Sequence, residues 1–292
     1  MAHLLFAGDL ARGTAAWYLM DALRAIADDP DDDRLTTLST LDLSKGPVIT
    51  RMRAALGLGW QARDHVRRIG QKAGQMVDAV LEVSGGPFRH LLGLGRTGVP
   101  TARWSDLRPD EPDRVWSERL AGAEGAHVFA LHRDALGSFS GMEASWLPVA
   151  APAAPEKKVA GEGPLRVDED DGDGLAPQVP PAPEGPAESR IAAYQGAALL
   201  VHATRDRLVT PRLMEALASG TPVVTTPLGD GFDTLFQVNQ HVLWCEPEHV
   251  QGQLERLSRH PRVAEIGRSA AERVERAHTY RARAETIIRH LL

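Results

Sequence analysis

The sequence has a single cysteine, Cys245, among its 292 residues. One thiol excludes an internal disulfide and any zinc site built from several cysteines, and it favours a structural role for Cys245. The sequence also lacks a long apolar run, which argues against a transmembrane helix. Its first residues have no basic start and too short an apolar run for a signal peptide, so we expect a cytoplasmic protein.

The sequence has fewer basic than acidic residues, with 33 lysines and arginines against 39 aspartates and glutamates, and its formal net charge is -6. This balance disfavours broad binding to the phosphate backbone of nucleic acids, although it leaves a local basic patch open. Basic residues do gather over 51–72. Apolar partners are sparse there, so an ordinary solvated helix face is favoured over membrane docking.

What the sequence does contain is an alternation of strand-like and helix-like segments, typical of a parallel sheet covered by helices. With 43% hydrophobic residues the chain can bury a sizeable core, and its length corresponds to about two domains. We predict a strand over 3–7, a glycine-containing turn over 8–14 and a helix over 15–27. Further strands are predicted over 35–41, 77–83, 99–104, 126–131, 145–148 and 197–202, and further helices over 48–76, 88–95 and 187–194.

The most informative segment spans 210–226. It predicts a helix that has Pro211 in its first turn, ends at a left-handed Gly220 and is followed at once by a buried strand. Arg212 and Glu215 are three residues apart and share a face of this helix. Arginine binds phosphate and a carboxylate accepts hydrogen bonds from a diol, so the pair suits a ligand that has both groups. A nucleotide sugar is such a ligand.

This segment and those after it resemble the carboxyl-terminal half of GT-B glycosyltransferases of group 1, in particular the spore-maturation-protein-like branch. After the strand come a turn into a short helix over 227–236, a strand over 241–244, an amphipathic helix over 250–257 and two closing helices, in the family's order. The resemblance covers about residues 190 to 292, and the amino-terminal half matches more loosely. It implies an α/β, GT-B-like fold of two Rossmann-like lobes with parallel sheets.

The chain divides into four parts. The resemblance implies a Rossmann-like acceptor-side domain over 1–148, a nucleotide-sugar-binding domain over 189–276, and a helix over 277–292 that crosses back to the first domain. Residues 149–188 are a linker, where the chain departs from the family. The linker is rich in alanine, proline, glycine and acidic residues, a composition that does not build a core. Either the carboxyl-terminal lobe is truncated to a sheet of three or four strands, or some linker residues form strands that the pattern does not reveal.

The acidic run in this linker twice spells Asp-x-Asp, the signature with which metal-dependent glycosyltransferases hold manganese. Its proline- and glycine-rich surroundings argue against carboxylates in fixed positions. A calcium loop counted from Glu169 also fails, because its twelfth position is Pro180 instead of glutamate. We therefore predict a solvated acidic linker, no metal site and no cofactor.

The resemblance assigns the donor site to the carboxyl-terminal lobe. It implies that Arg212 contacts the diphosphate and Glu215 the ribose, with Arg205 or Arg207 adding charge. Many retaining relatives carry an acidic residue eight positions before Glu215, where this sequence has Arg207, so the stereochemical outcome does not carry over. A glycine-bearing turn either offers N–H groups to the donor sugar or is a plain connection, and it contains Gly229, Asp230 and Gly231.

The amino-terminal lobe offers three more candidates. Gly13 and Thr14 lie in the first turn, which faces the cleft in relatives; they either contact the donor diphosphate or acceptor, or Thr14 simply caps the helix. Asp106 resembles an aspartate that the family often places after the equivalent strand. It either positions or deprotonates an acceptor hydroxyl, or it caps a turn.

These expectations favour a metal-independent glycosyltransferase that binds a nucleotide-diphosphate sugar between two lobes. It would transfer the sugar to a hydroxyl of an acceptor that the sequence does not identify: a small molecule, a protein, a lipid or DNA. Without a metal, fixed arginines and helix N-termini must neutralise the charge on the departing diphosphate. Two alternatives stay open, a glycosyltransferase-like binding or scaffold protein that has lost catalysis, and a nucleotide-sugar epimerase or hydrolase.

Overall fold

A computed structural model of the protein describes residues 3–26, 35–39, 77–83, 99–106, 108, 126–139, 141–154, 163–167, 179–204, 207–246 and 249–292. The predicted helices over 48–76 and 88–95 and the basic residues over 51–72 lie outside these ranges, as does Arg205.

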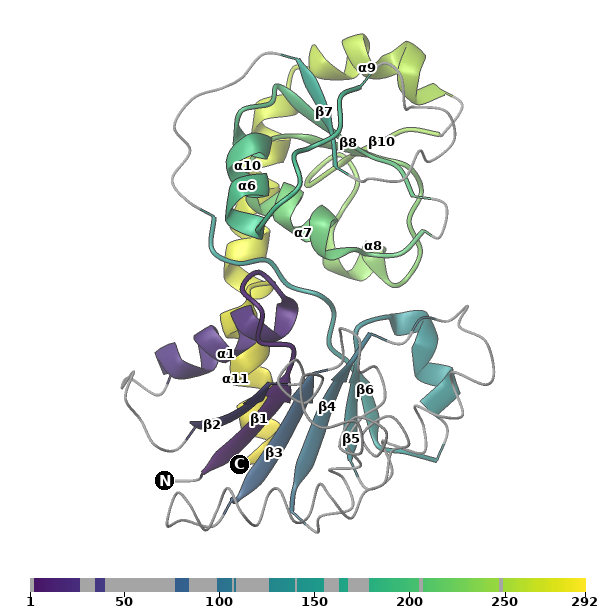
Figure 1. Ribbon diagram of the computed structural model, residues 1–292. Helices are drawn as coiled ribbons and strands as arrows, with labels where there is room; N and C mark the ends of the chain where they lie inside the picture. Colours follow the sequence, from purple (N-terminus) through teal and green to yellow (C-terminus); the bar gives the residue numbers. More distant parts are fainter. Residues whose placement is uncertain are drawn as a thin grey trace, which may run out of the picture. The chain divides into compact units, whose positions relative to one another are not determined.

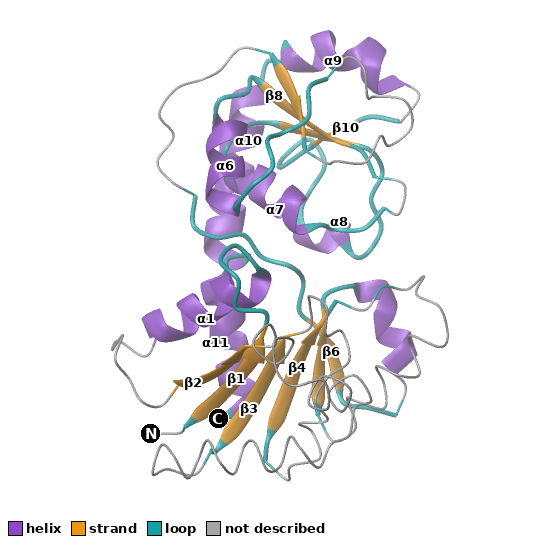
Figure 2. Ribbon diagram, viewed as in Figure 1, coloured by secondary structure: helices purple, strands orange, loops and turns teal. Residues whose placement is uncertain are grey.

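The chain forms two compact units. Unit 1 contains Met1–Pro148 and Arg283–Leu292, and unit 2 contains Val149–Ala282. Each unit has one parallel sheet with helices around it (Figure 1, Figure 2). The predicted α/β class with two parallel sheets is therefore confirmed.

Unit 1 is built on a six-stranded parallel sheet with the order β2-β1-β3-β4-β5-β6. Its described elements are β1 (Leu4–Gly8), α1 (Ala15–Ile26), β2 (Leu35–Ser39), β3 (Ala79–Val83), β4 (Thr101–Ser105), β5 (His127–Ala130), the 3-10 helix η2 (Arg133–Phe139) and β6 (Ala144–Trp146). The central strands β1, β3 and β4 are fully buried. The strand order reverses between β1 and β3, and open α/β sheets bind ligands outside the carboxyl ends of strands at such a point.

Glycine is required where β1 meets α1. A Cβ atom at Gly8 would lie 2.8 Å from the Cβ atom of Ala16, so any side chain there would separate the strand from the helix. The turn between them needs a second glycine, because Gly13 has φ of +91°. These two positions fix how closely the first turn passes over the end of the strand.

Unit 2 has a four-stranded parallel sheet with the order β10-β9-β8-β7. Its elements are β7 (Pro164–Arg166), α6 (Ala187–Gln195), β8 (Leu199–His202), α7 (Pro211–Ala218), β9 (Val223–Thr225), α8 (Phe232–Leu235), β10 (Leu243–Trp244), α9 (Val250–Ser258) and α10 (Val263–Ala277), and α11 (Tyr280–Leu291) leads into unit 1. α7 packs against both α6 and α10.

Strand β7 shows that some residues of 149–188 form a strand, which is one of the two alternatives that the sequence left open. Pro164 pairs with Leu199 in the parallel register of β7 and β8, and Val167, which follows the strand, is buried. The linker thus supplies an edge strand of the sheet. Three residues that begin with proline are too short to show the alternation of a strand, which is why the sequence pattern did not reveal it.

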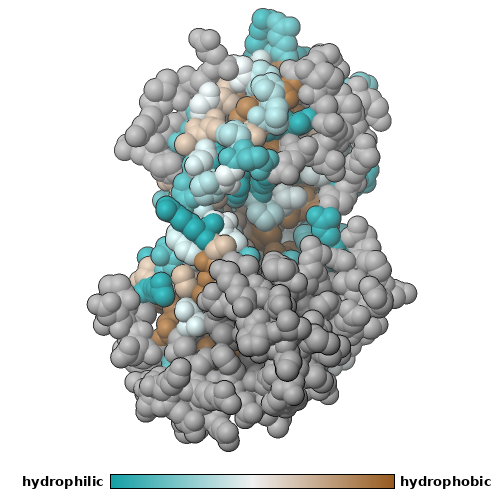
Figure 3. All heavy atoms as spheres, viewed as in Figure 1, coloured by the Kyte–Doolittle hydropathy of each residue, from teal (hydrophilic) through white to brown (hydrophobic). Residues whose placement is uncertain are grey.

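The surface of unit 2 mixes hydrophilic and hydrophobic residues on the face that Figure 3 displays. Within the described ranges, the large hydrophobic side chains classed as exposed are Trp244 and Leu292. Among these same ranges, no helix combines the length and the apolar character needed to cross a membrane.

Candidate functional site

Helix α7 begins as the sequence predicts. The hydroxyl of Thr210 accepts a hydrogen bond from the backbone N–H of Leu213 at 3.1 Å, and Pro211 occupies the first turn, where a missing N–H costs nothing. The helix ends at Ala218, Ser219 caps it, and Gly220 follows with φ of +75°. From Leu213 to Ala218 every residue is buried, Glu215 included, whereas Arg212 is half-buried.

Glu215 makes a two-pronged ion pair that the sequence analysis missed. Its Oε2 atom accepts from Nε of Arg190 at 2.7 Å, and its Oε1 atom accepts from Nη2 of the same arginine at 2.6 Å. The Glu215 and Arg190 side chains are only 5% and 13% exposed. Arg190 comes from α6, the neighbouring helix. The sequence did contain a signal for this ion pair. Glu215 is a carboxylate on an apolar helix, and a buried carboxylate needs a cation nearby.

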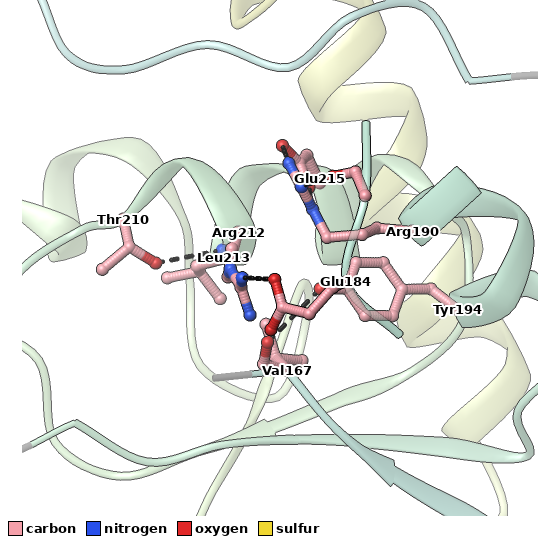
Figure 4. Close-up of polar contacts among 9 residues, drawn as sticks. Val167, Glu184, Arg190, Tyr194, Thr210, Arg212, Leu213 and Glu215 are labelled. Carbon is pink, nitrogen blue, oxygen red and sulfur yellow. Dashed lines mark hydrogen bonds and ion pairs between the residues drawn. The ribbon is translucent and has the colours of Figure 1, made fainter. Parts of the chain in front are cut away.

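Arg212 has a different partner. Its Nη2 atom lies 3.3 Å from Oε2 of Glu184, whose side chain is 73% exposed. Figure 4 shows the two pairs as separate, with Arg212 extending to Glu184 and Arg190 lying along Glu215. An ion pair with an exposed carboxylate contributes little, so Arg212 can exchange Glu184 for another anion at small cost.

The loops after β8 and β9 are joined at the carboxyl end of the sheet. The N–H of Gly229 donates to the carbonyl oxygen of Arg207 at 2.9 Å. Three residues of these loops have left-handed backbone, namely Arg207 and Asp230 at φ of 54° and Gly231 at 76°. Arg207 and Gly229 are exposed, whereas Asp230 is buried. The structure therefore brings the predicted residues 207 and 229–231 together at one edge of unit 2.

Two threonine hydroxyls at this edge are candidate ligand contacts that the sequence did not predict. Thr204 follows β8 and Thr226 follows β9, the neighbouring strand. Their Oγ1 atoms are buried and have no hydrogen-bond partner within the described part of the chain, and Thr226 as a whole is 4% exposed. Buried hydroxyls normally find a partner, so these two are candidates to bond a ligand. The sequence signal was a polar pair, Thr225 and Thr226, directly after an apolar strand.

In unit 1 the hydroxyl of Thr14 is engaged with the backbone. It accepts from the N–H of Trp17 at 3.1 Å and lies 2.9 Å from the carbonyl oxygen of Ala11. Thr14 thus caps α1, which is one of the two interpretations that the sequence left open. Asp106 is half-buried and comes directly after β4, at the carboxyl edge of the sheet.

A pocket of about 720 Å³ lies elsewhere in unit 2. Its lining includes Ala197 and Ala198, which precede β8, and Pro222, which precedes β9. These residues mark the amino ends of the strands, opposite the edge that carries Thr204 and Thr226. Most of the lining consists of alanine, glycine and proline, with one arginine, Arg268, so this pocket offers little to bind a diphosphate.

The whole chain is similar in fold to solved glycosyltransferases. Sucrose-phosphate synthase from Thermosynechococcus elongatus has a TM-score of 0.66 at 14% identity, with 99% of this chain and 98% of that chain covered. HepE of Anabaena in complex with UDP-glucose has a TM-score of 0.65 at 12% identity, covering 100% and 99%. A glycosyltransferase from Rickettsia africae has a TM-score of 0.63 at 12% identity, covering 99% and 97%. The protein thus has the α/β GT-B fold.

A match to a known family covers a smaller part of the chain. Residues 178–289, most of which lie in unit 2, match the family described as Glycosyl transferase-like. This range contains α7 with Arg212 and Glu215, and it contains Arg190. No curated protein matches the sequence. The fold and the matched domain together support the resemblance to group 1 glycosyltransferases.

Proposed function

We propose that this protein is a metal-independent glycosyltransferase of group 1, in the spore-maturation-protein-like branch. Unit 2 binds a nucleotide-diphosphate sugar, and the sugar passes to a hydroxyl of an acceptor. The observation that carries this proposal is a helix, α7, that presents Arg212 and Glu215 within the glycosyl transferase-like range 178–289. The likeness of the fold to HepE, which was solved with UDP-glucose, gives further support.

The diphosphate would be bound by cations. Arg212 lies in the first turn of α7, where the helix dipole also favours an anion. Its present partner, Glu184, is an exposed carboxylate that a phosphate can displace. Arg207 at the adjoining loop, together with Arg205, adds positive charge. These groups stabilise the leaving diphosphate as its bond to the sugar breaks.

The ribose hydroxyls would be bound by Glu215. A carboxylate has about four lone-pair sites, and Arg190 occupies two of them, so two remain for a diol. The fork of Arg190 also fixes the orientation of the carboxylate before the ligand arrives. Thr204 and Thr226 would gain the hydrogen bonds that they lack within the described residues. The loop over 229–231 would meet the donor sugar through Gly231, because the N–H of Gly229 already donates to the carbonyl oxygen of Arg207.

The transfer step forms a bond between the acceptor oxygen and the anomeric carbon and breaks the bond from that carbon to the diphosphate. The acceptor loses a proton, and Asp106 is our candidate to take it. Gly13 is the other unit 1 candidate, through its backbone N–H group, because the Thr14 hydroxyl already caps α1 and the Thr14 N–H donates to the carbonyl oxygen of Ala11 at 3.1 Å.

The first test is binding. Nucleoside diphosphates and nucleotide sugars should raise the melting temperature of the full chain, because a ligand at one hundred times its dissociation constant stabilises the native state by about 2.7 kcal/mol. Failure of the whole panel would favour the scaffold alternative. Turnover of the donor without any acceptor would favour the hydrolase or epimerase alternative.

The second test locates the site. Arg212→Ala should weaken nucleotide binding by roughly ten- to a hundredfold, because a hydrogen bond to a charged group contributes about 1.5–3 kcal/mol. Glu215→Gln should weaken the binding of ribonucleotides more than that of inorganic pyrophosphate. Arg259→Ala is the control, since Arg259 is 75% exposed and pairs only locally with Glu255. Full affinity in both site variants would place the donor elsewhere.

A further inference from the structure

Three side chains that the proposed transfer reaction does not use meet in unit 1. His127 is the first residue of β5, Glu143 immediately precedes β6, and His290 lies in the last turn of α11. One ligand atom from each of them lies within 4.8 Å of those of the other two. The His127 and His290 rings have centroids 3.8 Å apart, and Nδ1 of His127 is 3.8 Å from Oε2 of Glu143.

The backbone and its neighbours hold these residues in place. Strands β5 and β6 are paired, and the N–H of Val128 donates to the carbonyl oxygen of Glu143 at 2.8 Å. His290 also packs edge-on against the ring of Phe129, with centroids 5.4 Å apart. Two strands and a helix from distant parts of the chain therefore converge on one point.

The two nitrogens of His127 have different surroundings. Nε2 is 2.9 Å from the hydroxyl oxygen of Ser145, whereas Nδ1 is buried and has no hydrogen-bond partner within the described residues. When Nε2 donates its proton to Ser145, the lone pair of Nδ1 faces Glu143 and His290. A histidine that ligates a metal has this arrangement, with one nitrogen held by an outer hydrogen bond and the other directed at the ion.

A simple ion pair accounts for the cluster less well. Burial, followed by the charge of His290, lowers the pKa of His127, although Glu143 opposes the shift. The separation of 3.8 Å from Glu143 is also too long for a hydrogen bond.

We propose that His127, Glu143 and His290 form a zinc site that fastens the end of α11 to β5 and β6. Two imidazoles and a carboxylate are a donor set that zinc prefers, and a water would complete the tetrahedron, since Glu143 is 85% exposed. Calcium and magnesium favour oxygen ligands and suit the set poorly.

The site would have a structural role. It lies at the amino ends of β5 and β6, because His127 begins one strand and Glu143 precedes the other. Open α/β sheets bind substrates at the opposite edge. Zinc here would thus stabilise unit 1 without taking part in transfer, and nucleotide binding by unit 2 should not depend on it.

The experiment uses the full chain after treatment with a chelator. Titration calorimetry with zinc chloride should give one site per chain, and zinc should raise the melting temperature. His290→Ala and Glu143→Gln should each weaken zinc binding by about tenfold or more. Both residues are exposed, so these variants should fold. His249→Ala, an exposed histidine outside the cluster, should bind zinc as the unmodified protein does.

Cobalt(II) provides a readout that a merely structural histidine would not give. The unmodified protein and His249→Ala should show the visible absorption of tetrahedral cobalt, and His290→Ala should lose it. Magnesium should leave the melting temperature unchanged. The proposal is overturned if zinc does not bind, or if it binds equally well to His290→Ala and to the unmodified protein.

Discussion

At the residue scale, the partner of Glu215 matters as much as Glu215 itself. The sequence predicts a carboxylate beside Arg212 for a ligand, and the structure adds Arg190 as its two-pronged partner. Both side chains of this pair are largely buried. A buried ion pair adds little net stability, but removing one member leaves a charge without compensation.

Arg190→Met should therefore lower the free energy of unfolding by roughly 3 kcal/mol, because Glu215 would remain buried without its cation. Urea denaturation followed by circular dichroism measures this change. Arg259→Met is the matched control, since the Arg259–Glu255 pair has 75% exposed side chains and should contribute almost nothing. Equal effects of the two substitutions would contradict the structural role of Arg190.

His241 makes the stability of unit 2 depend on pH. Its Nδ1 atom accepts the N–H of Gln237 at 2.9 Å, and burial, followed by the charges of Arg273 and Arg276, lowers its pKa from the ordinary 6.5. The unfolded chain therefore binds a proton more readily than the folded chain does. The stability that neutral His241 contributes is complete above pH 6.5 and is lost as the pH falls through its lower folded pKa.

We expect the free energy of unfolding to decrease between pH 7 and pH 5, and to decrease less steeply in His241→Asn, whose amide oxygen accepts the same hydrogen bond without titrating. Urea denaturation at a series of pH values measures the slopes. His249→Asn, at an exposed histidine, should keep the slope of the unmodified protein. A slope in His241→Asn as steep as that control would refute the assignment.

At the element scale, α10 approaches the junction of α7 and β9 so closely that it tolerates no side chain. A Cβ atom at Gly267 would lie 2.4 Å from the carbonyl oxygen of Gly220 and 2.9 Å from the backbone nitrogen of Pro222. These are backbone atoms and cannot rotate away. The absence of a side chain at Gly267 thus lets α10 pack directly against the turn that follows α7.

Gly267→Ala should lower the free energy of unfolding by about 1–3 kcal/mol, as overpacking does elsewhere. Gly252→Ala is the matched control, because Gly252 lies in α9 and an added Cβ atom there would meet nothing within 4 Å. That substitution should instead stabilise by about 0.5–1 kcal/mol through helix propensity. Thermal or urea denaturation of both variants distinguishes the signs, and a stabilised Gly267→Ala would disprove the close packing.

At the scale of the whole molecule, the sequence predicts two parallel sheets because its strand-like and helix-like segments alternate, and the structure confirms this. Most strands lie within two or three residues of their predicted bounds, since buried parallel strands are continuous apolar runs. The exception is β7, a strand of three residues inside a proline-rich segment. Its place at the edge of the sheet depends on pairing with β8, and that pairing is not encoded locally.

The sequence alone determined the types of the described helices and most of the described strands, the cap and first turn of α7, the left-handed Gly220 and the presence of a cation and a carboxylate on that helix, because these depend on residues within a few positions of one another. Tertiary structure alone decided that Arg190 binds Glu215, that Thr204 and Thr226 share an edge, and that His127, Glu143 and His290 meet. Each of these arrangements joins residues that are far outside one another's local segment, so it depends on how strands and helices pack, and no periodicity or spacing in the chain records it.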